Sequence, residues 1–148
     1  MNQDFTYTVC QGCSQVNRVS VESPHGKKPV CGNCKAQLDT EDGVSELSAS
    51  AVRTLSEKSP VPVIVDFWAP WCQPCRVFTP VFKQAARQFA GQFVFAKVDT
   101  QANPLAGDYY QIRGVPTLVI FKNGTEVTRL TTAMPFNTFV QWIQRSVA

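Results

Sequence analysis

The chain has 148 residues, of which 44% are hydrophobic, 11% aromatic and 17% charged, a composition typical of folded globular proteins. Its 8 Gly and 10 Pro are too few for a collagen-like or low-complexity protein, and its apolar content is too high for a disordered one. The formal net charge is only +3, and the 14 Lys and Arg are spread along the chain instead of forming a dense basic face. We therefore expect no nucleic-acid partner.

The N-terminal sequence and the cysteine content predict where the protein works. Residues 1–10 lack the basic start and apolar core of a secretory signal. No apolar run approaches the length of about 18 residues that a membrane-spanning helix needs. We therefore expect a cytoplasmic protein without a membrane partner. Because the cytoplasm keeps structural thiols reduced, the six cysteines predict metal binding or redox chemistry, not a disulfide scaffold.

The six cysteines form three C-x-x-C pairs: Cys10 with Cys13, Cys31 with Cys34, and Cys72 with Cys75. The first two pairs lie in residues 1–36, a region with few aliphatic side chains and no helical periodicity, which cannot bury a core unaided. Long apolar runs separated by polar turns begin at about Val44 and predict a self-sufficient domain over 44–148. Residues 37–43 are interpreted as a linker.

The second part of the chain alternates expected strands and helices. A β-branched run at 61–68 predicts a buried strand, and apolar residues at spacings of three and four predict a helix from about Cys75 to Phe89 with a kink at Pro80. The elements expected after it are a strand at 93–98, a short helix near 105–110, strands at 117–121 and 126–130, and a closing helix from about 136 to 147. Asn123-Gly124 predicts a hairpin turn before the last strand, which we expect at a sheet edge. This order predicts an α/β fold with a mixed sheet flanked by helices.

Cys72 and Cys75 stand between an expected strand and an amphipathic helix, the context in which C-x-x-C is typical of a redox pair. At a helix N-terminus, free N–H groups and the helix dipole stabilise an anion, so Cys72 is expected to be the nucleophilic thiolate. Cys75 can attack a mixed disulfide formed at Cys72 and is expected to be the resolving thiol. The alternative is that the pair is half of a metal site.

Residues 44–148 resemble a thioredoxin through Asp66-Phe67-Trp68-Ala69, Trp71-Cys72-Gln73-Pro74-Cys75, Gly114-Val115-Pro116-Thr117 and Phe121-Lys122-Asn123-Gly124. The resemblance implies the thioredoxin fold, with Pro116 as a cis proline that faces the cysteine pair. It implies that the backbone at Val115 pairs with a bound substrate segment, that Trp71 covers the site and that Pro74 belongs to the same binding surface.

The resemblance further implies that Asp66 is a buried carboxylate behind Cys75, with Lys97 nearby. Burial raises the pKa of a carboxyl group, which would let Asp66 exchange a proton with the resolving thiol near neutral pH. The alternatives are that Asp66 is a core polar group with satisfied hydrogen bonds, and that Lys97 is a surface lysine at a strand end.

Two positions depart from the thioredoxin pattern. Gln73 replaces the usual Gly between the cysteines, which leaves the redox potential open. Thr132 stands where a Gly is usual in the docking surface, and its side chain could narrow the range of substrates.

The spacing Cys10-x2-Cys13-x17-Cys31-x2-Cys34 is typical of a four-cysteine zinc site. Small residues in or beside the pairs, Gly12, Gly32 and Asn33, suit the tight turns of such a site. A closed set of four thiolates leaves no open position for catalysis, so a Zn2+ ion there would be structural. His25 is interpreted as a solvated loop residue, not a ligand. The alternatives are two disulfides or a second redox centre.

A zinc-ribbon-like module followed by a thioredoxin domain resembles the zinc-binding thioredoxin 2 type of bacterial thioredoxins over essentially the whole chain. This resemblance implies a cytoplasmic protein-disulfide reductase that needs no organic cofactor and is re-reduced by an NADPH-dependent thioredoxin reductase. Its other partners would be disulfide-containing protein substrates. One alternative is a zinc-controlled redox chaperone or adaptor that binds client proteins. Another is a disulfide isomerase or oxidase, which would need a potential less reducing than about −270 mV.

Overall fold

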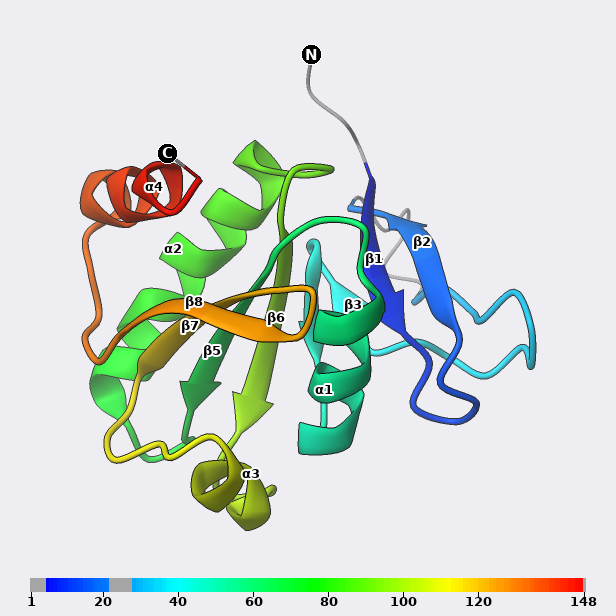
Figure 1. Ribbon diagram of the computed structural model, residues 1–148, viewed down its shortest axis with the longest axis horizontal. Helices are drawn as coiled ribbons and strands as arrows, with labels where there is room; N and C mark the ends of the chain where they lie inside the picture. Colours follow the sequence, from blue (N-terminus) through cyan, green and yellow to red (C-terminus); the bar gives the residue numbers. More distant parts are fainter. Residues whose placement is uncertain (1–4, 22–27, 148) are drawn as a thin grey trace.

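The computed structural model describes residues 5–21 and 28–147, so His25 lies outside the described residues. Within them, six strands form one mixed sheet in the order β3-β4-β6-β5-β7-β8, with helices on both faces (Figure 1). The strands are β3 (Thr40–Glu41), β4 (Val44–Glu46), β5 (Val63–Trp68), β6 (Val94–Asp99), β7 (Thr117–Lys122) and β8 (Thr125–Leu130). The expected α/β class is confirmed.

The central strand β5 is the apolar run that was expected to be buried, and its first five residues are all inaccessible to solvent. It pairs in parallel with β6 and antiparallel with β7, which makes the sheet mixed. The β7–β8 turn contains Asn123 and Gly124 with φ angles of 52° and 79°. Two successive positive φ angles are the requirement of a type I′ hairpin, so the predicted turn is confirmed. β8 forms the expected edge of the sheet.

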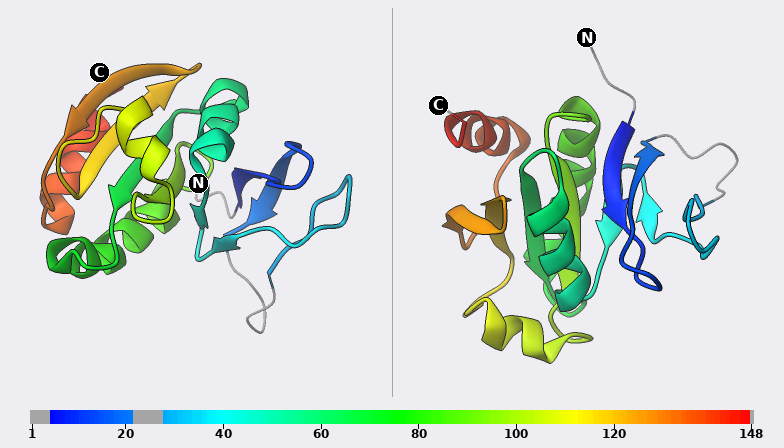
Figure 2. Two further views of the ribbon diagram at one scale, coloured as in Figure 1. Left: turned by 90° about the horizontal axis from the view of Figure 1, so that it is seen from below. Right: turned by 45° about the vertical axis from the view of Figure 1, so that its right-hand side comes forward.

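Two helices cover each face of the sheet. α1 (Ala49–Lys58) and α3 (Pro104–Tyr109) lie on one face, while α2 (Gln73–Gln88) and α4 (Phe136–Arg145) lie on the other (Figures 1 and 2). α2 begins slightly before the predicted start and runs through Pro80 as one helix. α1 was not predicted. Its signals are Ser48, whose hydroxyl caps the Ala51 N–H, and a buried face that includes Val52 and Leu55.

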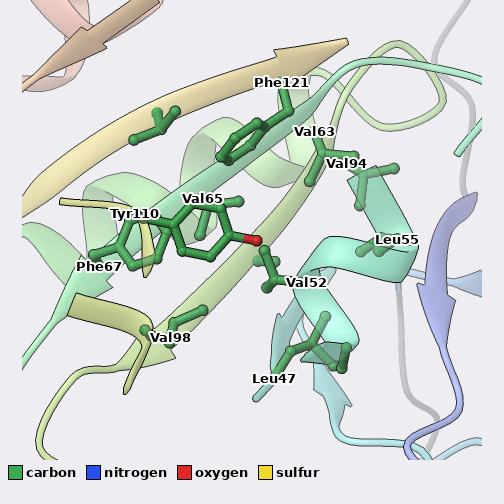
Figure 3. Close-up of a cluster of buried hydrophobic side chains, with 14 of the residues drawn as sticks. Leu47, Val52, Leu55, Val63, Val65, Phe67, Val94, Val98, Tyr110 and Phe121 are labelled. Carbon is green, nitrogen blue, oxygen red and sulfur yellow. The ribbon is translucent and has the colours of Figure 1, made fainter. Parts of the chain in front are cut away.

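The sheet separates two apolar cores. The core on the α1 side joins α1 to the central strands and to Tyr110 at the end of α3 (Figure 3); it includes Leu47, Val52, Leu55, Val63, Val65, Phe67, Val94, Val98 and Phe121. The core on the α2 side is rich in phenylalanine and includes Phe78, Phe82, Phe89, Phe93, Phe95 and Phe139. Because both faces of β5 are covered, polar groups on this strand are shielded from water.

The N-terminal residues form a hairpin of β1 (Phe5–Val9) and β2 (Val16–Ser20) beside α1 (Figures 1 and 2). Val9 is buried in the same core as Val52 and Leu55. Residues 37–43, interpreted above as a linker, contain strand β3 and the buried side chain of Leu38. No helix in the described part of the chain has the length and apolar character required to cross a bilayer.

Candidate functional site

Cys72 and Cys75 lie where β5 passes into α2, and the structure joins them by a disulfide. Cys72 is the N-cap of α2, and its Sγ accepts a hydrogen bond from the Cys75 backbone N–H at 3.2 Å. An N-cap position faces the unpaired N–H groups and the positive end of the helix dipole, which stabilise a thiolate. Cys75 is buried one turn further on, so the pair has the arrangement that the sequence predicted.

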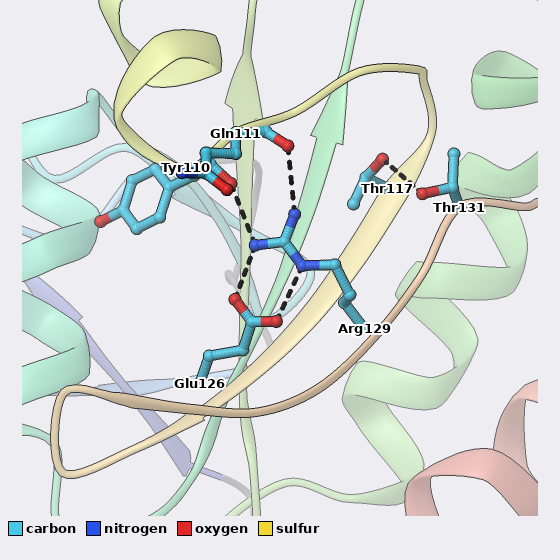
Figure 4. Close-up of polar contacts among 6 residues, drawn as sticks. All are labelled: Tyr110, Gln111, Thr117, Glu126, Arg129 and Thr131. Carbon is cyan, nitrogen blue, oxygen red and sulfur yellow. Dashed lines mark hydrogen bonds and ion pairs between the residues drawn. The ribbon is translucent and has the colours of Figure 1, made fainter.

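The loop before β7 faces the disulfide. The Val115–Pro116 peptide bond is cis, as the resemblance implied. The Val115 carbonyl oxygen lies 3.7 Å from Cys72 Sγ. The hydroxyl of Thr117 donates to the Gly114 carbonyl. It also lies 3.2 Å from the Thr131 hydroxyl (Figure 4). These bonds join the proline loop to the segment after β8.

Trp71 is 70% exposed beside the buried Cys72, which is only 4% exposed. Pro74 and Gln73 are also exposed, at the first turn of α2. Thr132 is exposed after β8, and its hydroxyl donates to the Ala133 carbonyl. Ala69, Cys72 and Cys75 form a small buried cluster against which Val115 packs. The disulfide therefore lies next to the Val115 carbonyl, and exposed side chains precede and follow Cys72 in the sequence.

Asp66 is fully buried on β5, on the face of the sheet that α2 covers. Neither of its carboxylate oxygens has a hydrogen-bond partner among the described groups. Burial raises the pKa of Asp66 to about 7. The positive charge of Lys97 acts in the opposite direction and lowers this pKa, whereas the negative charge of Glu46 raises it further. The described groups do not supply the hydrogen bonds that the alternative, a core carboxylate with satisfied hydrogen bonds, would need. A carboxyl group with this pKa gains and loses a proton near neutral pH.

Lys97 on β6 is half-buried next to Asp66 in the sheet register. Its Nζ donates to the Thr79 hydroxyl at 3.2 Å and lies 4.3 Å from the centre of the Trp68 ring. The Trp68 indole N–H in turn donates to the Glu46 carboxylate at 3.4 Å. Sequence analysis did not identify Glu46, because β4 is too short to show a pattern.

The four N-terminal cysteines converge although 17 residues separate the two pairs in the sequence. Their Sγ atoms all lie within 4.8 Å of one another. The Cys10–Cys34 and Cys13–Cys31 sulfur distances are 3.6 and 3.7 Å. A tetrahedral ion with metal–sulfur bonds of about 2.3 Å requires sulfur–sulfur distances of about 3.8 Å. The cysteine set therefore fits a tetrahedral metal ion.

The two cysteine turns have the same backbone geometry. The first cysteine of each pair, Cys10 or Cys31, donates its N–H to the carbonyl five residues later at 2.8 Å. Its carbonyl accepts the N–H of the residue four positions later, Ser14 or Lys35. Ser14 and Lys35 both have a φ angle of 66°, whereas no positive φ is found at Gly12 or Gly32. The residue after each pair, not the glycine within it, therefore makes the turn.

Hydrogen-bond donors surround the sulfur atoms. Asn17 reaches Cys31 Sγ with its amide at 3.5 Å and accepts the Gly32 N–H at 3.0 Å. The Asn33 amide reaches Cys13 Sγ at 3.5 Å. Hydrogen bonds lower the pKa of Cys31 to about 6; the largest contribution comes from the Cys34 N–H and the next from the Asn17 amide. Such donors stabilise metal-binding thiolates. Asn17 was missed because it lies on β2, outside the cysteine pairs.

A disulfide at the N-terminus of a helix, opposite a cis proline in a mixed α/β sheet, defines a thiol-disulfide oxidoreductase. The family model described as Thioredoxin matches residues 43–145, and the chain belongs to the thioredoxin family.

Similar proteins carry the same family name. Thioredoxin C-3 of Corynebacterium nephridii is 36% identical over 139 residues, which cover 94% of each chain. Thioredoxin M4, chloroplastic, of Arabidopsis thaliana is 43% identical over 114 residues; the match covers 76% of this chain and 59% of the relative's length. Thioredoxin 1 of Nostoc sp. is 46% identical over 87 residues, 59% of this chain and 81% of the relative. The match to Thioredoxin C-3 extends over most of the chain, beyond the part that the family model covers.

Proposed function

We propose that this protein is a cytoplasmic protein-disulfide reductase that acts through Cys72 and Cys75 and is re-reduced by an NADPH-dependent thioredoxin reductase. The observation that carries the proposal is the cysteine disulfide at the start of α2, beside the cis Val115–Pro116 bond. A helix N-terminus activates one thiol, and the adjacent loop offers backbone groups to a substrate.

The first step uses Cys72. In the reduced protein its thiolate attacks one sulfur of a substrate disulfide; a new Cys72–substrate S–S bond forms and the second substrate sulfur leaves as a thiolate, which takes a proton. The substrate segment would be held by the backbone at Val115, whose carbonyl oxygen lies 3.7 Å from Cys72 Sγ, and by the exposed side chains of Trp71 and Pro74. A substrate strand paired with the backbone at Val115 would bring its disulfide to Cys72 Sγ.

The second step uses Cys75 and Asp66. The Cys75 thiol gives its proton to the Asp66 carboxylate, and the resulting thiolate attacks Cys72 Sγ in the mixed disulfide. The Cys72–Cys75 bond forms, the substrate bond breaks, and the second substrate thiolate leaves and is protonated. Two electrons have then passed from the cysteine pair to the substrate. The pKa of Asp66 near 7 supports this role because the same group can accept and later release the proton.

We further propose that Cys10, Cys13, Cys31 and Cys34 hold one structural Zn2+, as in the zinc-binding thioredoxin 2 type, and that residues 1–36 form the metal-held module while 44–148 carry the chemistry. The sulfur–sulfur distances and the matched turns support the zinc site. When bound, the ion would add to the small buried cluster of Cys10, Val19, Cys31 and Leu38, which is too small to hold this region by itself. The protein's redox step needs no group from this site.

Reduction of insulin disulfides by the full chain, with NADPH and a thioredoxin reductase, tests the proposal. Cys72→Ser is expected to abolish reduction, because the attacking thiolate is lost. Cys75→Ser is expected to accumulate mixed disulfides with substrate, because the resolving thiol is lost. Equal trapping by both variants would contradict the assigned roles. Client binding that stays intact in Cys72→Ser, which has lost turnover and cannot form the mixed disulfide, would instead favour the chaperone or adaptor function.

A further inference from the structure

Three charged residues lie in one row across the sheet. Glu46 on β4 is the register partner of Lys97 on β6, and Lys97 is the register partner of Asp66 on β5. Directly paired residues on neighbouring strands point to the same face of a sheet. The row therefore runs from the exposed Glu46, through the half-buried Lys97, to the fully buried Asp66.

Lys97 stands between two carboxylates, yet within residues 5–21 and 28–147 it forms an ion pair with neither. Its ammonium donates to the Thr79 hydroxyl and lies over the Trp68 ring. The N–H of the same ring donates to Glu46. Trp68 thus links the cation to the outer carboxylate, and the inner carboxylate of Asp66 is left without a partner.

A pocket of about 260 Å³ opens at the outer end of the row. Glu46, Trp68, Thr79 and Lys97 line it, whereas Asp66 does not. The other charged groups that line the pocket are Lys28, Asp39, Glu41 and Lys83. Partial burial raises the pKa of Glu46, and the negative charge of Asp99 on β6 adds to that increase. Lys28 is paired with Asp39, and Lys83 with Asp42. Glu46 is therefore the pocket carboxylate that is linked to Lys97 through Trp68.

We propose that Glu46 is a positioning residue for Asp66: with Trp68 it holds the Lys97 ammonium at the pocket, away from the buried carboxylate. The inference rests on the proposed proton exchange between Asp66 and Cys75. A lysine that paired closely with Asp66 would stabilise its carboxylate and prevent it from carrying a proton at neutral pH. Glu46 opposes that pairing by offering Lys97 a second negative charge next to water.

The charges around Asp66 agree in sign with this role. The positive charge of Lys97 lowers the pKa of Asp66, and the negative charge of Glu46 raises it. Replacing Glu46 by a neutral residue removes the raising charge and lets Lys97 approach Asp66. Both effects lower the pKa of Asp66, so the sign of the expected shift does not depend on which is larger.

A direct test is a 13C NMR titration of the Asp66 carboxyl group in the reduced, full-length protein. Glu46→Gln keeps a hydrogen-bond acceptor for Trp68 and removes the charge. We expect the midpoint of the Asp66 titration to fall by about half a pH unit or more. The pH at which insulin reduction declines in acid should fall as well. The matched control is Glu41→Gln, a neighbouring pocket carboxylate, which should leave the midpoint in place.

A Lys97→Met background shows whether Glu46 acts through Lys97. In that background, adding Glu46→Gln should shift the Asp66 midpoint by much less than in the wild-type background. A shift of equal size in both backgrounds, or no shift in either, would overturn the positioning role. Because the titration needs no turnover, this result is separate from the reductase assay. An active wild-type protein with an unmoved midpoint in Glu46→Gln would refute the inference and leave the proposed function standing.

Discussion

The side-chain oxygen of Gln11 accepts a hydrogen bond from the backbone N–H of Ser48 at 3.0 Å. Gln11 lies inside the first cysteine pair, and Ser48 is the N-cap of α1. The cysteine turn is thus bound to the start of a helix in the thioredoxin fold. A second polar contact is buried: the hydroxyl of Ser45 on β4 donates to the hydroxyl of Thr8 on β1 at 2.8 Å. The N-terminal hairpin and the main sheet share both polar contacts and an apolar core, which predicts that they unfold together.

Val9→Ala is expected to destabilise the whole chain, although Val9 precedes the family match. Its side chain is 2% exposed in the core formed with α1. Loss of two buried methyl groups should lower the free energy of unfolding by about 1–3 kcal/mol. Denaturant unfolding followed by far-UV circular dichroism measures this. Val127→Ala on β8, where the side chain is 49% exposed, is the control and should change it by less than about 0.5 kcal/mol. Equal effects of the two variants would show that the hairpin does not contribute to the core.

Asp66→Asn is expected to stabilise the protein at alkaline pH and to lose that advantage in acid. The folded pKa of Asp66 is raised by burial to about 7, so the folded state binds a proton that the unfolded state releases above about pH 4. The wild-type protein therefore loses stability as the pH rises from about 4 to 7, by up to about 4 kcal/mol. Unfolding of wild type and Asp66→Asn at pH 4.5 and pH 8.5 tests the sign. A stability difference that is independent of pH would contradict a raised folded pKa.

The same substitution should slow insulin reduction more at neutral than at high pH. Hydroxide can replace a missing proton acceptor when its concentration rises. The ratio of wild-type to Asp66→Asn activity, measured between pH 6.5 and 9, should therefore fall as the pH increases. A constant ratio would point to a folding effect instead of proton transfer.

Metal analysis of the full chain is expected to find one zinc ion per molecule, and none in the double variant Cys10→Ser, Cys13→Ser. Four thiolates at tetrahedral spacing make a closed site, and two remaining sulfurs do not. The double variant should retain insulin reduction, because Cys72 and Cys75 lie on other elements, but it should unfold at lower denaturant concentration. Zinc retained by the double variant would contradict the ligand set.

Arg129→Met is expected to loosen the segment that leads into the cis proline. The Arg129 guanidinium forms an ion pair with Glu126 and donates to the carbonyl oxygens of Tyr110 and Gln111 (Figure 4). Loss of these charged hydrogen bonds should lower the free energy of unfolding by about 1–2 kcal/mol. Amide hydrogen exchange between residues 110 and 116 should become faster. Arg145→Met, at the exposed end of α4, is the control. Unchanged amide hydrogen exchange in Arg129→Met would show that the contacts of the Arg129 guanidinium do not hold residues 110–116 in place.

The sequence alone determined the α/β class, the redox pair and the four-cysteine spacing. These features are local: β5 is a continuous apolar run, α2 has a clear helical period, and Asn123-Gly124 suits one turn type. Each of them can be read from the order of residues along the chain, without knowledge of which distant segments pack together.

Tertiary structure decided the rest. β4 is only three residues long and has no pattern of its own, so the row from Glu46 to Asp66 appears only when three strands that are distant in sequence pair in register. Residues 37–43 resemble a linker in sequence, yet β3 joins the sheet. The four sulfur atoms and the packing of Val9 on α1 likewise depend on long-range contacts. Local composition does not encode such contacts, because burial is a property of the whole fold and not of any single segment.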